Sequence, residues 1–104
     1  MPKAKRVVWS PAAEQDLLDI WAYYARIASA DVADNLLREI DRVGEAIGKN
    51  PLLSRDRSEL MPRLRSVIVR PHVMFFLLGN DDVKIARVLH SRRHFPAIFA
   101  REDQ

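Results

Sequence analysis

The residues with the clearest chemical potential lie in the last third of the chain, in the segment Arg87-Val88-Leu89-His90-Ser91-Arg92-Arg93. An arginine can stabilise the negative charge that develops on a phosphate, and a histidine can transfer a proton near neutral pH. Arg65, Arg87 and His90 therefore supply the residue types for acid–base cleavage of RNA without a metal ion. Composition alone does not establish that these side chains converge.

Other kinds of catalytic or cofactor site have little support in the sequence. The chain contains no cysteine, and its histidines, His72, His90 and His94, lack carboxylates at the spacing of a metal site. No serine lies in a nucleophile motif, and the three glycines form no phosphate-binding loop. The pair Asp81-Asp82 follows a glycine and an asparagine, a combination typical of a tight turn. We therefore predict no metal and no cofactor.

The positive charge of the chain is concentrated in its second half. The net charge is +3 at pH 7, whereas residues 60–94 alone carry +5. That segment has seven basic residues, Arg63, Arg65, Arg70, Lys84, Arg87, Arg92 and Arg93, against the two acidic residues Asp81 and Asp82. Such asymmetry favours an anionic partner: a nucleic acid, a nucleoprotein machine or an acidic protein. The alternative is a solvated basic face that binds nothing.

These residues need a scaffold, and the first half of the sequence predicts a strand followed by two helices. Residues 5–9 form a short β-prone run. Ser10 then caps a helix over about residues 11–26, because a serine oxygen accepts a free N–H at a helix start and the proline that follows fits the first turn. Ser29 caps a second helix that ends before Asn50-Pro51. The short link between them predicts an antiparallel helical hairpin.

Each predicted helix carries one apolar stripe at helical spacing. The first stripe is Ala13, Leu17, Ile20, Trp21 and Tyr24, and the second is Ala33, Leu36, Leu37, Ile40, Val43 and Ile47. Gly44 and Gly48 lie near the second stripe and lower helix stability. We therefore expect another element to approach the helix backbone closely at these glycines.

The second half of the sequence predicts three strands, over Arg63–Arg70, His72–Leu78 and Val83–His90. The middle run is almost wholly apolar, as expected of a central strand, and turn residues 79–82 predict a hairpin after it. Alternation in the last strand predicts Val83, Ile85, Arg87 and Leu89 on one face, with Lys84, Ala86, Val88 and His90 on the other. Each face contains one or two polar residues, so the pattern leaves open which face meets the helices.

The segments around these strands are predicted to be irregular. Residues 52–62 should form a solvated loop, and Pro71 should interrupt strand pairing at one edge. The apolar tail over residues 94–100 should pack back on the sheet, with Pro96 limiting it to a short helical turn.

Helices grouped before an antiparallel sheet predict a two-layer α+β fold. An N-terminal strand and an antiparallel two-helix hairpin would pack on an antiparallel sheet completed by three C-terminal strands, as a single domain over residues 1–104. The helical hairpin would cover one sheet face and leave the other free or partly covered. No apolar run approaches the ~20 residues that cross a membrane, and those near the N-terminus are too few for a signal peptide. We therefore expect a cytoplasmic protein with no membrane partner.

Several short motifs, in order along the chain, carry a resemblance to a known family. They are WSPAAEQDL at residues 9–17, NP at 50–51, RSEL at 57–60, LRS at 64–66, HVMFF at 72–76 and RVLHSRR at 87–93. Together they resemble the ParE toxins of bacterial type II toxin–antitoxin systems, within the broader RelE/ParE superfamily. The resemblance covers nearly the whole chain.

The resemblance implies a compact α+β toxin that inhibits DNA gyrase, and so replication, and is neutralised by direct binding of a small ParD-like antitoxin. A toxin of this kind needs no catalytic residue, and it contacts nucleic acid only indirectly. The residues expected to contact the target are Arg63, Arg65, Arg70, Arg87, His90, Arg92 and Arg93. Those expected to seat the antitoxin are Trp21, Tyr24, Arg65 and Arg87. Core packing is the competing interpretation for Trp21 and Tyr24, and hydrogen bonds within the fold for Arg87 and His90.

Two alternatives remain open. RelE-like members of the superfamily cleave mRNA on the ribosome, and here Arg65 and Arg87 would stabilise phosphate charge while His90 transfers a proton. Ribonuclease relatives often place Arg and Tyr in the strand that is HVMFF here, and this chain has no tyrosine after Tyr24. The other alternative is a toxin-like module that only binds its antitoxin.

Overall fold

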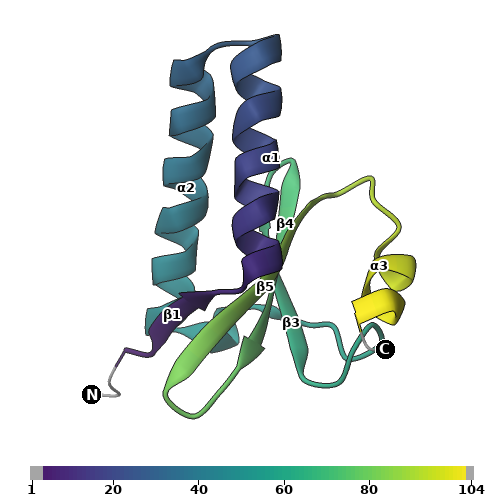
Figure 1. Cartoon of the computed structure of the whole chain (residues 1–104). Coiled ribbons are helices and arrows are strands. Elements are labelled where there is room, and N and C mark those ends of the chain that lie inside the picture. Colours follow the sequence, from purple (N-terminus) through teal and green to yellow (C-terminus); the bar gives the residue numbers. More distant parts are fainter. Residues whose placement is uncertain (1–3, 103–104) are drawn as a thin grey trace.

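The structure, a computed structural model, describes residues 4–102. Its elements are β1 (Arg6–Trp9), α1 (Pro11–Ile27), α2 (Ala30–Lys49), the 3-10 helix η1 (Pro51–Leu53), β2 (Arg55–Asp56), β3 (Leu64–Val69), β4 (His72–Leu78), β5 (Asp82–His90) and α3 (Phe95–Glu102). Figure 1 shows the strand, the helical hairpin and the sheet of the predicted α+β class, which is confirmed. Within the described residues, no helix is long and apolar enough to cross a membrane.

The strands form one sheet in the order β1-β5-β4-β3-β2. β3, β4 and β5 pair antiparallel as predicted, with the apolar β4 at the centre, and the short β2 adds to β3 in the same antiparallel manner. β1 instead runs parallel to β5, with Arg6 opposite Asp82 and Trp9 opposite Ile85. The sheet is therefore mixed rather than wholly antiparallel. β2, the first strand after the two helices, runs opposite to β1, whereas β3 and β5 run in the direction of β1.

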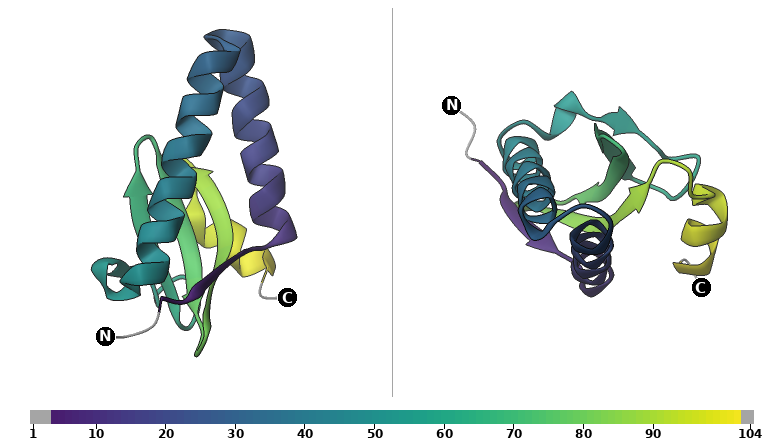
Figure 2. Two further views of the ribbon diagram at one scale, coloured as in Figure 1. Left: turned by 90° about the vertical axis from the view of Figure 1, so that its left-hand side faces the viewer. Right: turned by 90° about the horizontal axis from the view of Figure 1, so that it is seen from above.

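The helical hairpin lies against one face of the sheet and extends past its end (Figures 1 and 2). Both predicted caps are present: Ser10 Oγ accepts from the Ala13 N–H at 3.0 Å, and Ser29 Oγ accepts from the Val32 N–H at 3.1 Å. The Ser10 hydroxyl also donates to the Ala86 carbonyl at 2.8 Å. One side chain thus caps α1 and anchors its start to β5.

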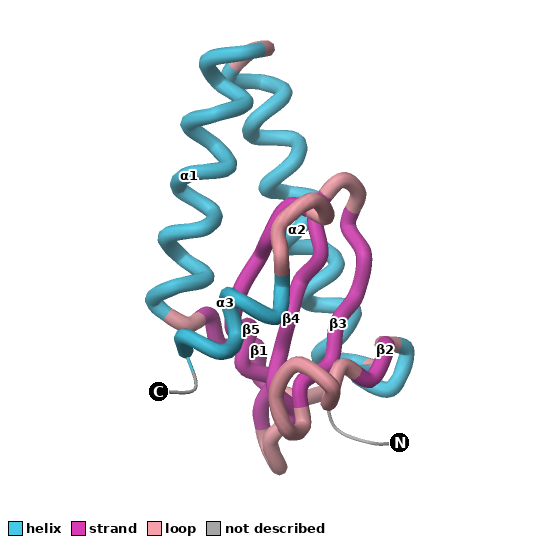
Figure 3. Tube along the Cα trace, turned by 90° about the vertical axis from the view of Figure 1, so that its right-hand side faces the viewer, coloured by secondary structure: helices cyan, strands magenta, loops and turns pink. Residues whose placement is uncertain are grey.

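The sheet divides the core into two apolar clusters. The larger one lies between the helices and the sheet and includes Ile20, Ile40, Met74, Phe76 and Val88. The smaller one, Leu64, Val73, Phe75, Leu89 and Phe99, lies on the face that α3 covers (Figure 3). The predicted partial cover of the second face is therefore confirmed. The tail forms an eight-residue helix rather than a single turn, because Pro96 occupies the first turn, where its missing N–H has no helical partner.

An extra residue in β5 changes which side chains face the helices. Consecutive residues of β4 pair with Ile85 and Arg87, so Ala86 has no partner and forms a β-bulge. Val88 then joins Ile85 in the helix-side cluster, whereas Leu89 packs in the opposite cluster. The predicted alternation is wrong beyond Ala86, because a bulge moves every later side chain to the other face.

Three further predictions need correction. Pro71 does not interrupt pairing, because it forms with Arg70 the two-residue turn between β3 and β4, and the strands pair on both sides of that turn. Trp21 does not join the buried stripe: it is 37% exposed, and its indole N–H donates to Asp34 Oδ1 at 2.8 Å near the solvent surface. The expected loop after η1 contains the short strand β2, which pairs with Arg65 and Ser66.

The predicted close approach at the helix glycines is confirmed. A Cβ atom built on Gly48 would lie 2.9 Å from the Lys5 carbonyl oxygen and 2.9 Å from Val7 Cγ2. The Lys5 N–H also donates to the Gly48 carbonyl at 2.8 Å. At Gly44 the nearest atom would be in the Trp9 ring, at 3.3 Å. The two glycines allow α2 to lie directly on β1.

We expect Gly48→Ala to lower the free energy of unfolding by about 1–3 kcal/mol, because the added methyl group must displace the β1 backbone. This cost exceeds the gain of about 1 kcal/mol in helix propensity. Gly44→Ala is the matched control, with a smaller effect, because the Trp9 side chain can shift. Urea denaturation measures both variants, and equal stability of Gly48→Ala and the parent chain would contradict the close contact.

Candidate functional site

The residues singled out around β5 meet at the end of the sheet where β4 begins and β5 ends. A pocket of about 500 Å³ lies there, between the second half of α1 and the two strands. It is lined by Asp16, Asp19, Ile20, Tyr23, Tyr24, His72, Val88, Leu89, His90 and Arg93. Because α1 continues past the sheet (Figure 1), this pocket opens at a corner between the helical hairpin and the strand ends.

The floor of this corner is fixed by a carboxylate from α1. The Asp16 oxygens accept from Arg87 Nε and Arg87 Nη2, each at 2.8 Å, and from the Val88 N–H at 2.9 Å. The two side chains are only 11% and 18% exposed, so the bidentate pair is well shielded from water. Arg87 is therefore held by the fold rather than projecting from it.

Sequence reasoning missed Asp16 as a site residue, although one signal was available. Asp16 lies three residues after Ala13 and four before Ile20, which places an acid on the buried side of α1. A buried carboxylate requires a donor, and a basic residue on a neighbouring element would have been the natural choice.

Two histidines and a tyrosine form the next layer of the pocket. His72 is 3% exposed, and its Nδ1 atom has no hydrogen-bond partner among the described residues. Its ring lies edge-on to Tyr24 and His90, with centroid distances of 6.1 and 5.6 Å. Burial, and secondly the nearby His90, lower the pKa of His72 below its ordinary value. His90 Nδ1 accepts from the Arg92 N–H at 3.1 Å.

The rim of the corner is basic. Arg70, Arg92 and Arg93 are exposed, and residues 4–102 offer none of them an ion-pair partner. The Ser91 N–H donates to the Pro71 carbonyl at 2.9 Å, which joins the turn after β3 to the end of β5. The fold thus brings these three arginines to one end of the sheet.

Arg63 and Arg65 lie elsewhere. Arg65 donates from Nε to Ser54 Oγ at 2.7 Å and from Nη2 to the Ser54 carbonyl at 2.8 Å, which fixes the segment before β2. Arg63 is exposed in the turn before β3, with φ at 68°. Arg65 and Arg87 stand on strands separated by β4. The set Arg65, Arg87 and His90 is therefore not brought together.

Arg57, which sequence reasoning placed in a solvated loop, covers the second core instead. Its guanidinium carbon lies 5.4 Å from the Phe75 ring centroid and 5.6 Å from that of Phe95. Its Nε donates to a Glu59 carboxylate oxygen at 3.0 Å, and its side chain is 13% exposed. No spacing in the sequence signals this stacking, which depends on where α3 packs.

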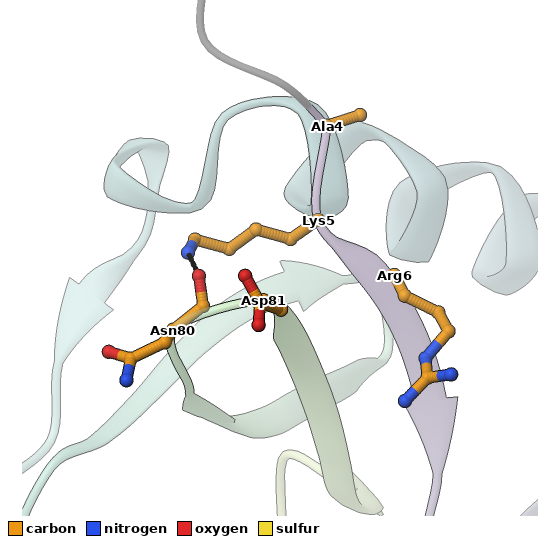
Figure 4. Close-up of a pocket in the computed structure, with 5 residues that line it drawn as sticks. All are labelled: Ala4, Lys5, Arg6, Asn80 and Asp81. Atoms are coloured by element: carbon orange, nitrogen blue, oxygen red, sulfur yellow. Dashed lines mark hydrogen bonds between the residues drawn. The ribbon is translucent and has the colours of Figure 1, made fainter.

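A second hollow, beside the β4–β5 turn, has a structural explanation. The Lys5 ammonium donates to the carbonyls of Gly79 and Asn80 and so holds the turn against β1 (Figure 4). Its cation is thereby engaged. No group of three or more metal-ligating side chains occurs anywhere in the part of the chain that the structure describes.

Comparison with known proteins identifies the family. A family model described as the ParE toxin of the type II toxin–antitoxin system parDE matches residues 7–95. The chain belongs to the ParE toxin family. The toxin part of the predicted function is thus confirmed.

Relatives of the chain cover nearly its whole length. Toxin ParE1 of Mycobacterium tuberculosis is 30% identical over 90 residues, which is 86% of this chain and 92% of the relative. Toxin ParE3 of Caulobacter vibrioides is 32% identical over 92 residues, 88% of this chain and 92% of that protein.

Solved structures share the fold of this ParE-family chain. A chain of the chromosomal ParDE system from P. aeruginosa superposes with a TM-score of 0.74 at 17% identity, covering 84% of this chain and 96% of that one. A YoeB dimer from Staphylococcus aureus gives a TM-score of 0.60 at 16% identity, covering 85% and 98%.

We expect Asp16→Asn to lower the free energy of unfolding by about 2–4 kcal/mol, because it leaves the shielded Arg87 cation without its counter-charge. The asparagine oxygen can still accept from the Val88 N–H, so the loss reports mainly on the ion pair. Glu39→Gln, which breaks the exposed pair with Arg42, is the control and should leave stability nearly unchanged. Thermal and urea unfolding at pH 7 measure both variants. An equal loss of unfolding free energy in Asp16→Asn and Glu39→Gln would refute the bidentate link.

Stability should also depend on His72 in mildly acidic solution. Burial holds the pKa of His72 in the folded state below the unfolded value of about 6.5. As the pH falls, the unfolded chain therefore takes up the His72 proton at a higher pH than the folded chain does. Stability is therefore lost as the pH falls from about 7 toward the folded-state pKa, by at most about 1.4 kcal/mol per pH unit.

His72→Phe removes this titration and keeps a ring in the same place. Between pH 7 and 5 its unfolding free energy should fall less than that of the parent chain. The exposed His94→Asn serves as the control and should keep the parent slope. The same slope in all three proteins would show that His72 is not desolvated.

Proposed function

We propose that this chain is a gyrase-directed toxin of a type II toxin–antitoxin system, neutralised by direct binding of a ParD-like antitoxin. The family match over residues 7–95 carries the proposal, because the family is defined by the parDE pair. The action is inhibition by binding, and the chain itself catalyses no reaction.

The free arginines of the sheet end are the groups best placed for the target. Arg70, Arg92 and Arg93 form an exposed cationic rim, with Arg63 exposed at another turn. Exposed cations without internal partners steer association with an anionic surface. Arg65 and Arg87 support the binding surface through Ser54 and Asp16 rather than by reaching into solvent.

The helical hairpin is the surface best suited to the antitoxin. Its exposed apolar side chains include Leu18, Tyr23, Ile27 and Val32, with Trp21 beside them. Exposed apolar residues gathered on one projecting element mark protein-binding surfaces. Tyr24, which packs partly in the core, would contribute mainly by shaping the sheet-facing side.

Ribosome-dependent mRNA cleavage is the alternative function. The geometry gives it less support, because Arg65 and Arg87 lie two strands apart and each bonds to a partner within the fold. Of Arg65, Arg87 and His90, only His90 lines the pocket. Its Nδ1 accepts from the Arg92 N–H, which leaves Nε2 available for other contacts.

We expect the parent chain to inhibit gyrase supercoiling in a purified assay and to cause filamentation with double-strand breaks in cells. Arg92→Gln/Arg93→Gln should raise the concentration needed for half inhibition by about tenfold, since each rim charge contributes roughly 0.5–1 kcal/mol. Arg38→Gln/Lys49→Gln removes the same charge from the exposed side of α2 and should act like the parent. Cleaved mRNA on translating ribosomes, with supercoiling untouched, would exclude gyrase as the target.

A further inference from the structure

The pocket between α1 and the ends of β4 and β5 has hydrogen-bond donors left over. Of its two carboxylates, Asp16 is engaged by Arg87 and the Val88 N–H, and the exposed Asp19 accepts from the Gln15 amide at 2.9 Å. Tyr23, Tyr24 and Arg93 line the same pocket, and no hydrogen bond engages the two hydroxyls or the guanidinium within residues 4–102. These three side chains therefore supply donors that the described fold leaves unused.

His90 adds a further donor. Its Nδ1 atom accepts from the Arg92 N–H, so the neutral ring carries its proton on Nε2. The neighbouring His72 ring, almost fully buried, also keeps one nitrogen without a partner. A buried polar atom left unpaired costs folding free energy, and a bound partner is one way to satisfy it.

The electrostatics of the pocket allow an anion. The Asp16 charge is paired with that of Arg87, and the other charged side chains of the lining, Asp19 and Arg93, are one of each sign. Arg70 and Arg92 lie exposed at the same end of the sheet. The field at the mouth is therefore positive, and a phosphate there would gain charge-assisted hydrogen bonds from arginine and tyrosine.

The pocket also has an aromatic wall. Tyr23, Tyr24, His72 and His90 form a chain of rings, each edge-on to the next, with centroid distances of 5.1, 6.1 and 5.6 Å. Ile20 and Leu89 complete the apolar lining. Planar bases bind such surfaces by stacking and edge contacts. A volume of about 500 Å³ accepts one nucleotide, not a helix or a folded partner.

We propose that this pocket binds a nucleoside monophosphate, with the phosphate on Arg93 and the tyrosine hydroxyls and the base against the rings. The ligand could come as a free nucleotide or as the phosphorylated end of a strand, and both present the same chemistry. The site does not depend on the proposed gyrase target, because binding involves only this chain. It gives the family toxin a small-molecule site at the corner of the sheet, which shares Tyr23 with the exposed face of the helical hairpin.

The test is an amide NMR titration of the full, isotopically labelled chain with AMP. We expect saturable shifts at Tyr24, Leu89 and His90. Arg93→Gln and Tyr24→Phe should each weaken AMP binding about three- to tenfold, since each removes one donor while keeping the fold. Arg38→Gln, an exposed arginine on α2, should bind like the parent.

Three further ligands decide the chemistry. Inorganic phosphate or N-acetyltryptophan binding as tightly as AMP would overturn the proposal, since the site would then recognise any anion or a peptide carboxylate. A short single strand with a terminal phosphate that displaces AMP supports the strand end as the source, and failure to displace it supports the free nucleotide. No saturable shift up to about 10 mM AMP would refute the site. If the chain failed to inhibit gyrase in the supercoiling assay, the result of the AMP titration would still stand.

Discussion

The carboxylate of Asp16 is the contact on which the arrangement at the end of the sheet depends. It joins α1 to β5 through three hydrogen bonds, two from Arg87 and one from the backbone of Val88. β1 pairs with β5 only as far as Ile85, so the edge of β5 beyond the bulge at Ala86 would otherwise lack a partner. A buried backbone N–H must be satisfied, and here a helix side chain replaces the missing strand. The Asp16 contact therefore fixes the position of α1 on the sheet at the end where the candidate functional residues lie.

The same contact decides which arginines are available to a partner. Arg87 and Arg65 both lie in the basic half of the chain, yet each is bound inside the fold, one to Asp16 and the other to Ser54. Arg92 and Arg93 follow β5 in a turn whose direction is fixed by the bond from Ser91 to Pro71. The net charge of the segment is thus divided between arginines that build the corner and arginines that project from it.

Much of the fold could be predicted because its signals are local. The caps at Ser10 and Ser29, the apolar β4 and the tight contact at Gly48 follow from neighbouring residues and were confirmed. The bulge at Ala86 was missed, although the apolar alternation of β5 changes phase after Ile85, where Arg87 stands in place of an apolar residue and Val88 follows it. The parallel pairing of β1 with β5 joins the two ends of the chain, and no local pattern signals it.

The candidate site was harder to predict than the fold, for a physical reason that concerns tertiary pairing. Arg87, His90 and Arg93 stand close together in sequence and were treated as one basic cluster, but the structure gives them three environments: a shielded ion pair, a half-buried ring and an exposed cation. The first two environments are set by residues far along the chain, Asp16 for Arg87 and His72 for His90. The sequence shows the positive charge of the β5 segment, but not the acidic residues of other elements that neutralise part of it. The role of an arginine at such a site is therefore best assigned once its carboxylate partner is known. In this chain Asp16 distinguishes Arg87, which is bound within the fold, from Arg93, which is exposed.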